Sequence, residues 1–141
     1  MTHDEASRVF TSLMNDVFNR GDFTVVDDLV AADFHNHEAP DSPGPAGFTA
    51  TAAWLRSAFL DYHADLEELV VEDDLMVARL MVSGTHLGDF MGFAPTGRRF
   101  RVQHMHMYRV RDGKLVEHWA CRDDLGQLTQ LGLLPTPHPA S

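Results

Sequence analysis

The spacing of the apolar residues changes once along this chain of 141 residues, near residue 64. Before that point apolar residues recur every three or four positions, which is the period of an amphipathic helix. Beyond it they alternate with polar residues, which is the period of a half-buried strand. A chain that runs from helices into strands predicts an α+β fold, with three N-terminal helices packed against a curved antiparallel sheet.

Three helices are predicted in the first half of the chain. Residues 4–20 carry one apolar stripe and end at Gly21, residues 22–34 form a second helix, and residues 48–63 form a third. The segment 35–47 contains three prolines and two glycines, which is typical of a loop.

Four strands are predicted in the second half, at residues 65–72, 75–86, 98–110 and 114–123. The last two strands are joined by Asp112 and Gly113, a pair of residues that favours a two-residue hairpin turn. Residues 87–97 are expected to form a loop with a short helical piece, and residues 124–132 a final short helix.

The net charge of −10 argues against binding to nucleic acid or to an anionic membrane surface. The N-terminus lacks the basic and apolar segments of a signal peptide, and no apolar stretch approaches the roughly 20 residues of a membrane helix. A single cysteine, Cys121, fits a reducing compartment. We therefore expect one cytoplasmic domain at residues 1–134, followed by a short C-terminal tail at residues 135–141.

The hairpin predicts how the last two strands pair, because a one-residue shift would move every side chain to the other face. In the simplest register His104 lies opposite Cys121, and Asp123 lies one diagonal step from His104 on the same face, within reach of one small substrate. Asp124 lies on the other face, opposite Arg101. A carboxylate in apolar surroundings is a stronger base than one in water, so Asp123 is the candidate catalytic base and Asp124 a partner in an ion pair.

These residues also allow other interpretations. Asp123 is a suitable N-cap for the helix predicted to follow it. The pairs His104/His106 and His35/His37 contain ligand types that bind zinc, although histidines in a loop beside prolines are more often surface residues. We therefore expect no metal and no cofactor.

Three further features bear on function. Cys121 could act as a thiol nucleophile near the histidines, but no cationic loop or helix N-terminus is evident to activate it. The glycines do not form the phosphate-binding pattern that nucleotide sites require. Met105 and Met107 face away from the histidines, which suggests a surface for a homodimer.

Two segments carry a resemblance to a known family. Residues 84–97 and the Trp–x3–Asp–x–Leu–Gly pattern at residues 119–126 resemble the SnoaL-like polyketide cyclases, which belong to the nuclear-transport-factor-two-like superfamily. The resemblance implies a cone-shaped α+β fold that encloses an apolar pocket, often within a homodimer or homotetramer. It also implies an intramolecular aldol closure of a polyketide methyl ester, without metal or cofactor.

The resemblance places the family's catalytic aspartate, four residues after the strand tryptophan, at Asp123. It implies that His104 or His106 donates a hydrogen bond to the developing enolate. The expected substrate-binding residues are Asn36, His37, Trp54, Phe59, His86, Phe90 and Trp119. The same pocket could serve a dehydratase, an isomerase, an epoxide hydrolase or a cofactor-free hydroxylase, and a binding module without catalysis or a purely structural protein also remains open.

Overall fold

The computed structural model describes residues 1–134, so the expected tail at residues 135–141 lies outside the described part of the chain. Its helices are α1 (His3–Ser12), a π-helix (Leu13–Asn19), a 3-10 turn (Phe23–Val25), α2 (Val26–Leu29), α3 (Gly44–Ala58) and α4 (Asp124–Gln130). Its strands are β1 (Val30–Asn36), β2 (His63–Glu72), β3 (Leu75–Thr85), β4 (Arg99–Arg111) and β5 (Lys114–Arg122).

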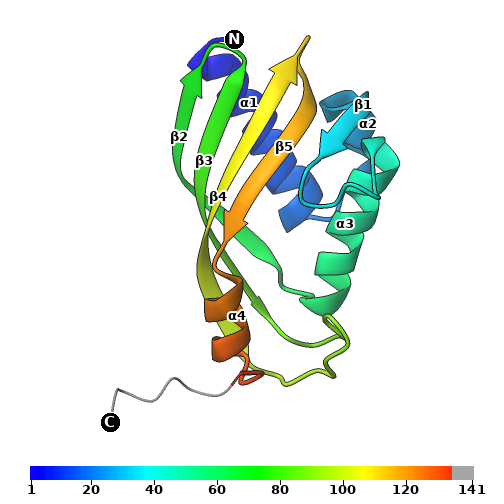
Figure 1. Ribbon diagram of the computed structural model, residues 1–141, viewed down its shortest axis with the longest axis vertical. Coiled ribbons are helices and arrows are strands. Elements are labelled where there is room, and N and C mark those ends of the chain that lie inside the picture. The colour runs from blue at the N-terminus through cyan, green and yellow to red at the C-terminus, as the bar shows by residue number, and fades with distance from the viewer. Residues whose placement is uncertain (135–141) are drawn as a thin grey trace.

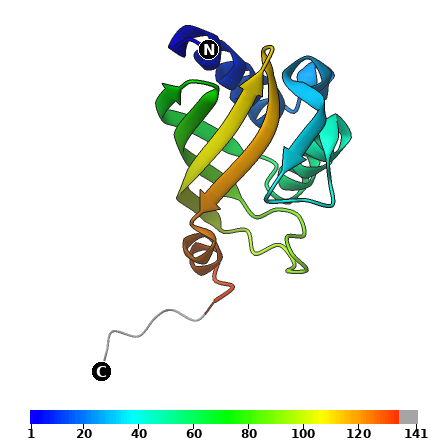
Figure 2. The same cartoon turned by 45° about the horizontal axis from the view of Figure 1, so that its top comes forward.

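The five strands form one curved sheet in the order β1-β5-β4-β3-β2. Helices α1, α2 and α3 lie on one side of this sheet, and α4 continues from the end of β5 (Figures 1 and 2). The predicted α+β class, with N-terminal helices packed on a curved sheet, is confirmed. No helix within residues 1–134 has the length and apolar character needed to cross a membrane.

The second predicted helix, residues 22–34, is correct in its first half and wrong from residue 30 onward. Only its first part is helical, and Val30–Asn36 forms strand β1, which pairs with β5 in the parallel direction. The buried residues Val30 and Phe34 are four positions apart, a spacing that fits a helix as well as a strand. The partner strand lies about 80 positions further along the chain, so local periodicity carries no signal for it.

The predicted hairpin between the last two strands is confirmed. Asp112 and Gly113 both have positive φ angles, 53° and 76°, as a tight turn of the I′ type requires. The loop at residues 87–97 lacks the expected helical piece; its one regular feature is a bridge between Phe90 and Phe93.

The predicted register of β4 and β5 holds only next to the hairpin. Val110 pairs with Leu115, but Arg109 pairs with Glu117, so Val116 is an extra residue that forms a β-bulge. From that point each partner is displaced by one residue. His104 therefore lies opposite Arg122 rather than Cys121, and the alternate residues of β5 that face the helices change accordingly.

Candidate functional site

A cavity of about 450 Å³ lies between the inner face of the sheet, helix α3 and helix α4. Its walls combine aromatic and aliphatic side chains with a few polar groups, which is typical of small-molecule sites. The residues that line it are Phe18, Asn36, Glu38, Ala39, Phe48, Thr51, Trp54, Leu55, Tyr62, Val82, Phe90, Met91, His104, His106, Tyr108, His118, Arg122, Asp124, Gln127 and Leu128.

Five of the residues predicted from the sequence line this cavity: Asn36, Trp54, Phe90, His104 and His106. Strand alternation places His104 and His106 on the inner face of β4. Trp54 of α3 stacks on Phe90 with ring centroids 5.2 Å apart, and Trp54 is 45% exposed, so this pair contributes an edge of the cavity that solvent reaches.

Four predicted substrate-binding residues lie elsewhere. Trp119 lies on the outer face because of the bulge, where His37 stacks on it at 4.8 Å. Phe59 and His86 are fully buried in the core beside the cavity but do not line it. His86 accepts a hydrogen bond from the Thr96 backbone, which ties down the loop that carries Phe90.

Asp123 does not line the cavity, and its inward orientation in the predicted register is wrong. It is the N-cap of α4, and its Oδ1 accepts a 2.8 Å hydrogen bond from the Gly126 backbone. The carboxylate lies so close to Gly126 that a Cβ there would be 2.2 Å from Oδ2. The Asp–x–x–Gly spacing therefore has a structural cause, and the capping interpretation is confirmed.

Asp124 also differs from the prediction. It lies at the cavity, with its side chain 65% exposed, and its Oδ1 is 3.6 Å from Nε of Arg122. Arg101, its predicted partner, instead pairs on the outer face with Asp65 and Glu67.

Four side chains on β1, β4 and β5 form a continuous hydrogen-bonded chain along the inner face. His118 Nδ1 is 2.8 Å from Asn36 Oδ1, and His118 Nε2 is 2.8 Å from His106 Nδ1. His106 Nε2 is in turn 3.2 Å from His104 Nδ1. Parallel pairing of β1 with β5 sets Asn36 directly beside His118, so the chain depends on the unpredicted strand.

Burial keeps these imidazoles uncharged at neutral pH. Burial, together with a smaller contribution from the nearby Arg122 guanidinium, lowers the pKa of His104 to about 4 and the pKa of His118 to about 3. Burial also lowers the pKa of His106, and its histidine neighbours add to this effect. The cavity therefore presents neutral imidazoles beside one guanidinium.

Sequence reasoning missed His118, Arg122 and the two tyrosines of the cavity, Tyr62 and Tyr108. Burial raises the pKa of both tyrosines, so both stay protonated, and the Tyr108 ring stacks on His118 at 4.4 Å. The β-bulge that turns His118 and Arg122 inward has one trace in the sequence, the two consecutive apolar residues Leu115 and Val116 after the hairpin. They indicate a bulge only when both are known to be buried.

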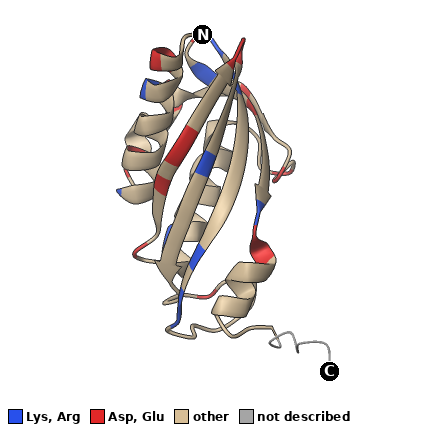
Figure 3. Ribbon diagram, turned by 90° about the vertical axis from the view of Figure 1, so that its left-hand side faces the viewer, with Lys and Arg blue, Asp and Glu red and all other residues tan. Residues whose placement is uncertain are grey.

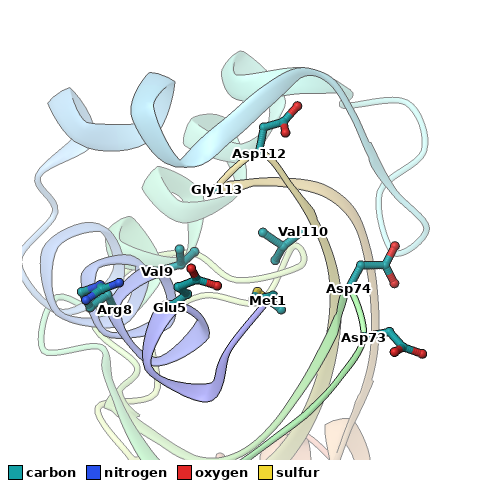
Figure 4. Close-up of a pocket in the computed structure, with 9 residues that line it drawn as sticks. All are labelled: Met1, Glu5, Arg8, Val9, Asp73, Asp74, Val110, Asp112 and Gly113. Atoms are coloured by element: carbon teal, nitrogen blue, oxygen red, sulfur yellow. The ribbon is translucent and has the colours of Figure 1, made fainter.

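A second hollow, of about 500 Å³, lies at the N-terminal end of the molecule. There α1 approaches the tips of the β2–β3 and β4–β5 hairpins, and the lining side chains are mostly charged (Figure 4). None of the candidate site residues contributes to it.

The two His–x–His pairs lie on opposite faces of the sheet. His104 and His106 point into the cavity, while His37 is paired on the outer face with Glu117 at 2.8 Å. Within residues 1–134 no three His, Cys, Asp or Glu side chains converge in a way that could hold a metal ion.

Comparison with known proteins gives a consistent result. Residues 8–131 match the SnoaL-like polyketide cyclase family. The chain is 35% identical over 132 residues to the aklanonic acid methyl ester cyclase DnrD of Streptomyces peucetius. The alignment covers 89% of this chain and 90% of that protein. The chain is also 34% identical over 124 residues to the nogalonic acid methyl ester cyclase of Streptomyces nogalater, covering 84% of this chain and 92% of that protein.

The fold is also similar to a solved structure, that of TsrD from Streptomyces laurentii. The two align with a TM-score of 0.89 and 28% sequence identity, over 95% of this chain and 99% of TsrD.

Proposed function

Because the chain belongs to the SnoaL-like polyketide cyclase family, we propose that it closes a carbon ring by an intramolecular aldol reaction on a polyketide methyl ester. It is an enzyme of this cyclase type. The names of its relatives refer to aklanonic and nogalonic acid methyl esters, and the proposed substrate belongs to the same chemical class.

The observation that carries the proposal is the composition of the cavity. Its walls are mainly apolar, and they also contain the uncharged imidazole of His104 and the guanidinium of Arg122. Phe18, Phe48 and Leu55 provide apolar surface for the rings or chain of a polyketide. Arg122 Nε faces Asp124 at 3.6 Å, and within residues 1–134 the guanidinium donates no hydrogen bond to protein, so its N–H groups are available to a substrate oxygen.

In the proposed reaction a C–H bond flanked by two carbonyl groups breaks, and its electron pair forms an enolate. The enolate carbon attacks a ketone carbonyl of the same molecule, which forms the new C–C bond and an alkoxide. The alkoxide takes up the proton, so the product is an isomer of the substrate. We propose that Arg122 stabilises the enolate oxygen, since a positively charged donor contributes most where negative charge develops.

Asp123 is one candidate for the base, on the strength of the family resemblance. Its charge reaches His104, whose pKa it raises slightly against the larger effect of burial. Asp123→Asn keeps the acceptor that caps α4 and removes the basic oxygen. If Asp123 is the base, this substitution lowers kcat by about 10²–10⁴-fold and leaves the free energy of unfolding nearly unchanged. Asp65→Asn, which changes an acid of the outer face, is the matched control. Turnover of Asp123→Asn near the wild-type rate would leave Asp123 with the capping role alone.

The proposed function is tested by incubating the protein with aklanonic acid methyl ester and with nogalonic acid methyl ester, and by analysing the products by mass spectrometry and NMR. A ring-closed product of unchanged mass supports the proposal. Loss of water would indicate a dehydratase, gain of water an epoxide hydrolase, and gain of oxygen a hydroxylase. Tight binding of both esters without any product would indicate a binding module.

A further inference from the structure

In the hydrogen-bonded chain from Asn36 to His104, each contact has one donor and one acceptor. The contacts of Asn36 determine which group plays which role along the whole chain. Asn36 Oδ1 accepts a 3.0 Å hydrogen bond from the Glu38 backbone N–H. A backbone N–H can only donate, so this contact fixes which end of the Asn36 side chain carries the oxygen. The same oxygen is the partner of His118 Nδ1, which must therefore carry a proton.

Each neutral imidazole passes this constraint to the next, because it has one N–H and one lone pair. With its proton on Nδ1, His118 presents the lone pair of Nε2 to His106, whose Nδ1 must donate across the 2.8 Å contact. His106 Nε2 is then an acceptor and receives the Nδ1–H of His104 at 3.2 Å. His104 Nε2 is left with a lone pair.

This lone pair is available to a substrate. His104 lines the cavity, and its Nε2 has no hydrogen-bond partner within residues 1–134. His104 Nε2 is also accessible from the cavity. Among residues 1–134, His86 Nε2 is the one side-chain nitrogen or oxygen that is both fully buried and without a hydrogen-bond partner, so the unpartnered His104 Nε2 is not fully buried. An imidazole in this form cannot donate the hydrogen bond to an enolate that the family resemblance suggested; it can accept a proton.

We propose that His104 Nε2, rather than Asp123, is the base that removes the substrate proton, because Asp123 caps α4 and does not line the cavity. His106, His118 and Asn36 are then positioning residues that hold His104 in the required tautomer. The inference rests on the proposed function and names the group that performs its first step. The substrate C–H bond breaks, an N–H bond forms at Nε2, and the electron pair remains on the enolate beside Arg122. The same proton then passes from Nε2 to the alkoxide, which restores neutral His104.

The burial that keeps His104 neutral in the empty cavity does not oppose this step. The enolate formed beside it is an anion, and an adjacent negative charge favours the imidazolium form. The positive charge that develops on His104 strengthens its Nδ1–H bond to His106, because hydrogen bonds from charged donors are stronger than neutral ones.

The first test measures the tautomers directly, without substrate, by long-range ¹H–¹⁵N NMR of the ¹⁵N-histidine-labelled protein at pH 7. A neutral histidine free in water carries its proton mainly on Nε2, whereas we expect Nδ1 to be protonated and Nε2 unprotonated in His104, His106 and His118. Observation of an Nε2–H on His104 in the folded wild-type protein would overturn the inference, whether or not the protein cyclises a polyketide.

The second test compares two substitutions at the start of the chain. Asn36→Asp retains an acceptor for His118 and should keep the Nδ1–H tautomers. Asn36→Leu has a similar size but no acceptor, so we expect loss of the tautomer pattern and a fall in kcat of about 10–100-fold, with KM little changed. Equal behaviour of the two folded variants in NMR and turnover would contradict the positioning role.

The third test is His104→Gln, for which we expect a loss in kcat of about 10²–10⁴-fold in a protein that remains folded. Near wild-type turnover by this variant would overturn the base assignment and leave the proposed function intact. If the wild-type protein itself forms no cyclised product, both the proposed function and the catalytic role of His104 fail. The NMR result still decides which ring nitrogen of each of the three histidines carries the proton.

Discussion

The two faces of the sheet use the same residue types in opposite ways. On the inner face, His104, His106 and His118 contact one another and face one cation, Arg122. On the outer face, histidine and arginine side chains pair with acids, as His37 does with Glu117. Figure 3 shows acidic and basic positions on neighbouring strands.

The difference follows from burial. Outer-face pairs such as Arg109 with Asp74 stay in contact with water, so each charge is solvated as well as paired. On the inner face of the described sheet no acid forms an ion pair with His104, His106 or His118, so an added charge would lose its hydration with little compensation and the histidines remain neutral. The inner face therefore offers lone pairs for chemistry, and the outer face contributes only modestly to stability.

The largest expected effect is acid destabilisation through the inner histidines. Their pKa values are lowered in the folded protein, to about 4 for His104, so the unfolded chain binds protons at higher pH than the folded one. The free energy of unfolding should be highest above pH 6.5 and fall by on the order of 3 kcal/mol for His104 as the pH drops toward 4. Urea unfolding at pH 7 and pH 4.5 measures the decrease.

The variant His104→Gln provides the control for this measurement, because it removes the titrating group. Its stability should depend less on pH than that of the wild type over the same interval. An unchanged pH dependence would show that His104 is not held neutral by the fold.

Arg122→Gln should lower kcat by about 10²–10³-fold, as expected for loss of one donor to an oxyanion. It should also raise the pKa of His104, since the guanidinium lowers that pKa in the wild type. The matched control is Arg109→Gln, which removes an arginine from the outer face. If the two variants lose activity equally, the inner cation has no special role.

Asp123→Ala should reduce the free energy of unfolding by about 1 kcal/mol, because the N-cap of α4 is lost. Asp123→Asn should cost much less, since its side-chain oxygen can still accept from Gly126. Thermal unfolding of both variants measures the difference. Equal destabilisation would mean that the cap does not contribute as proposed.

The smallest effect is expected for Arg101→Gln on the outer face, where the arginine contacts Asp65 and Glu67. The partners are about half exposed, so the change should be about 0.2–1 kcal/mol and should shrink as salt is added. A loss comparable to that caused by acidification would contradict the distinction between the two faces.

Local patterns were sufficient for much of the fold. The helix at residues 4–20, the four antiparallel strands and the Asp112-Gly113 turn each follow from the periodicity or turn chemistry of a short segment. Strand alternation alone also placed His104 and His106 together on one face. These features depend on neighbours within a few residues, which is the range over which propensity acts.

The arrangement of the site required contacts between distant segments. The extra residue at Val116 reversed the faces of β5, so that His118 and Arg122 point inward while Trp119 points outward. A bulge depends on how both strands pack, and no local motif specifies it. Likewise, Asn36 meets His118 only because Val30–Asn36 joins the sheet edge. Sequence patterns therefore predict some of the side chains that could do chemistry, such as His104 and His106, whereas the long-range pairing of backbones decides which side chains meet.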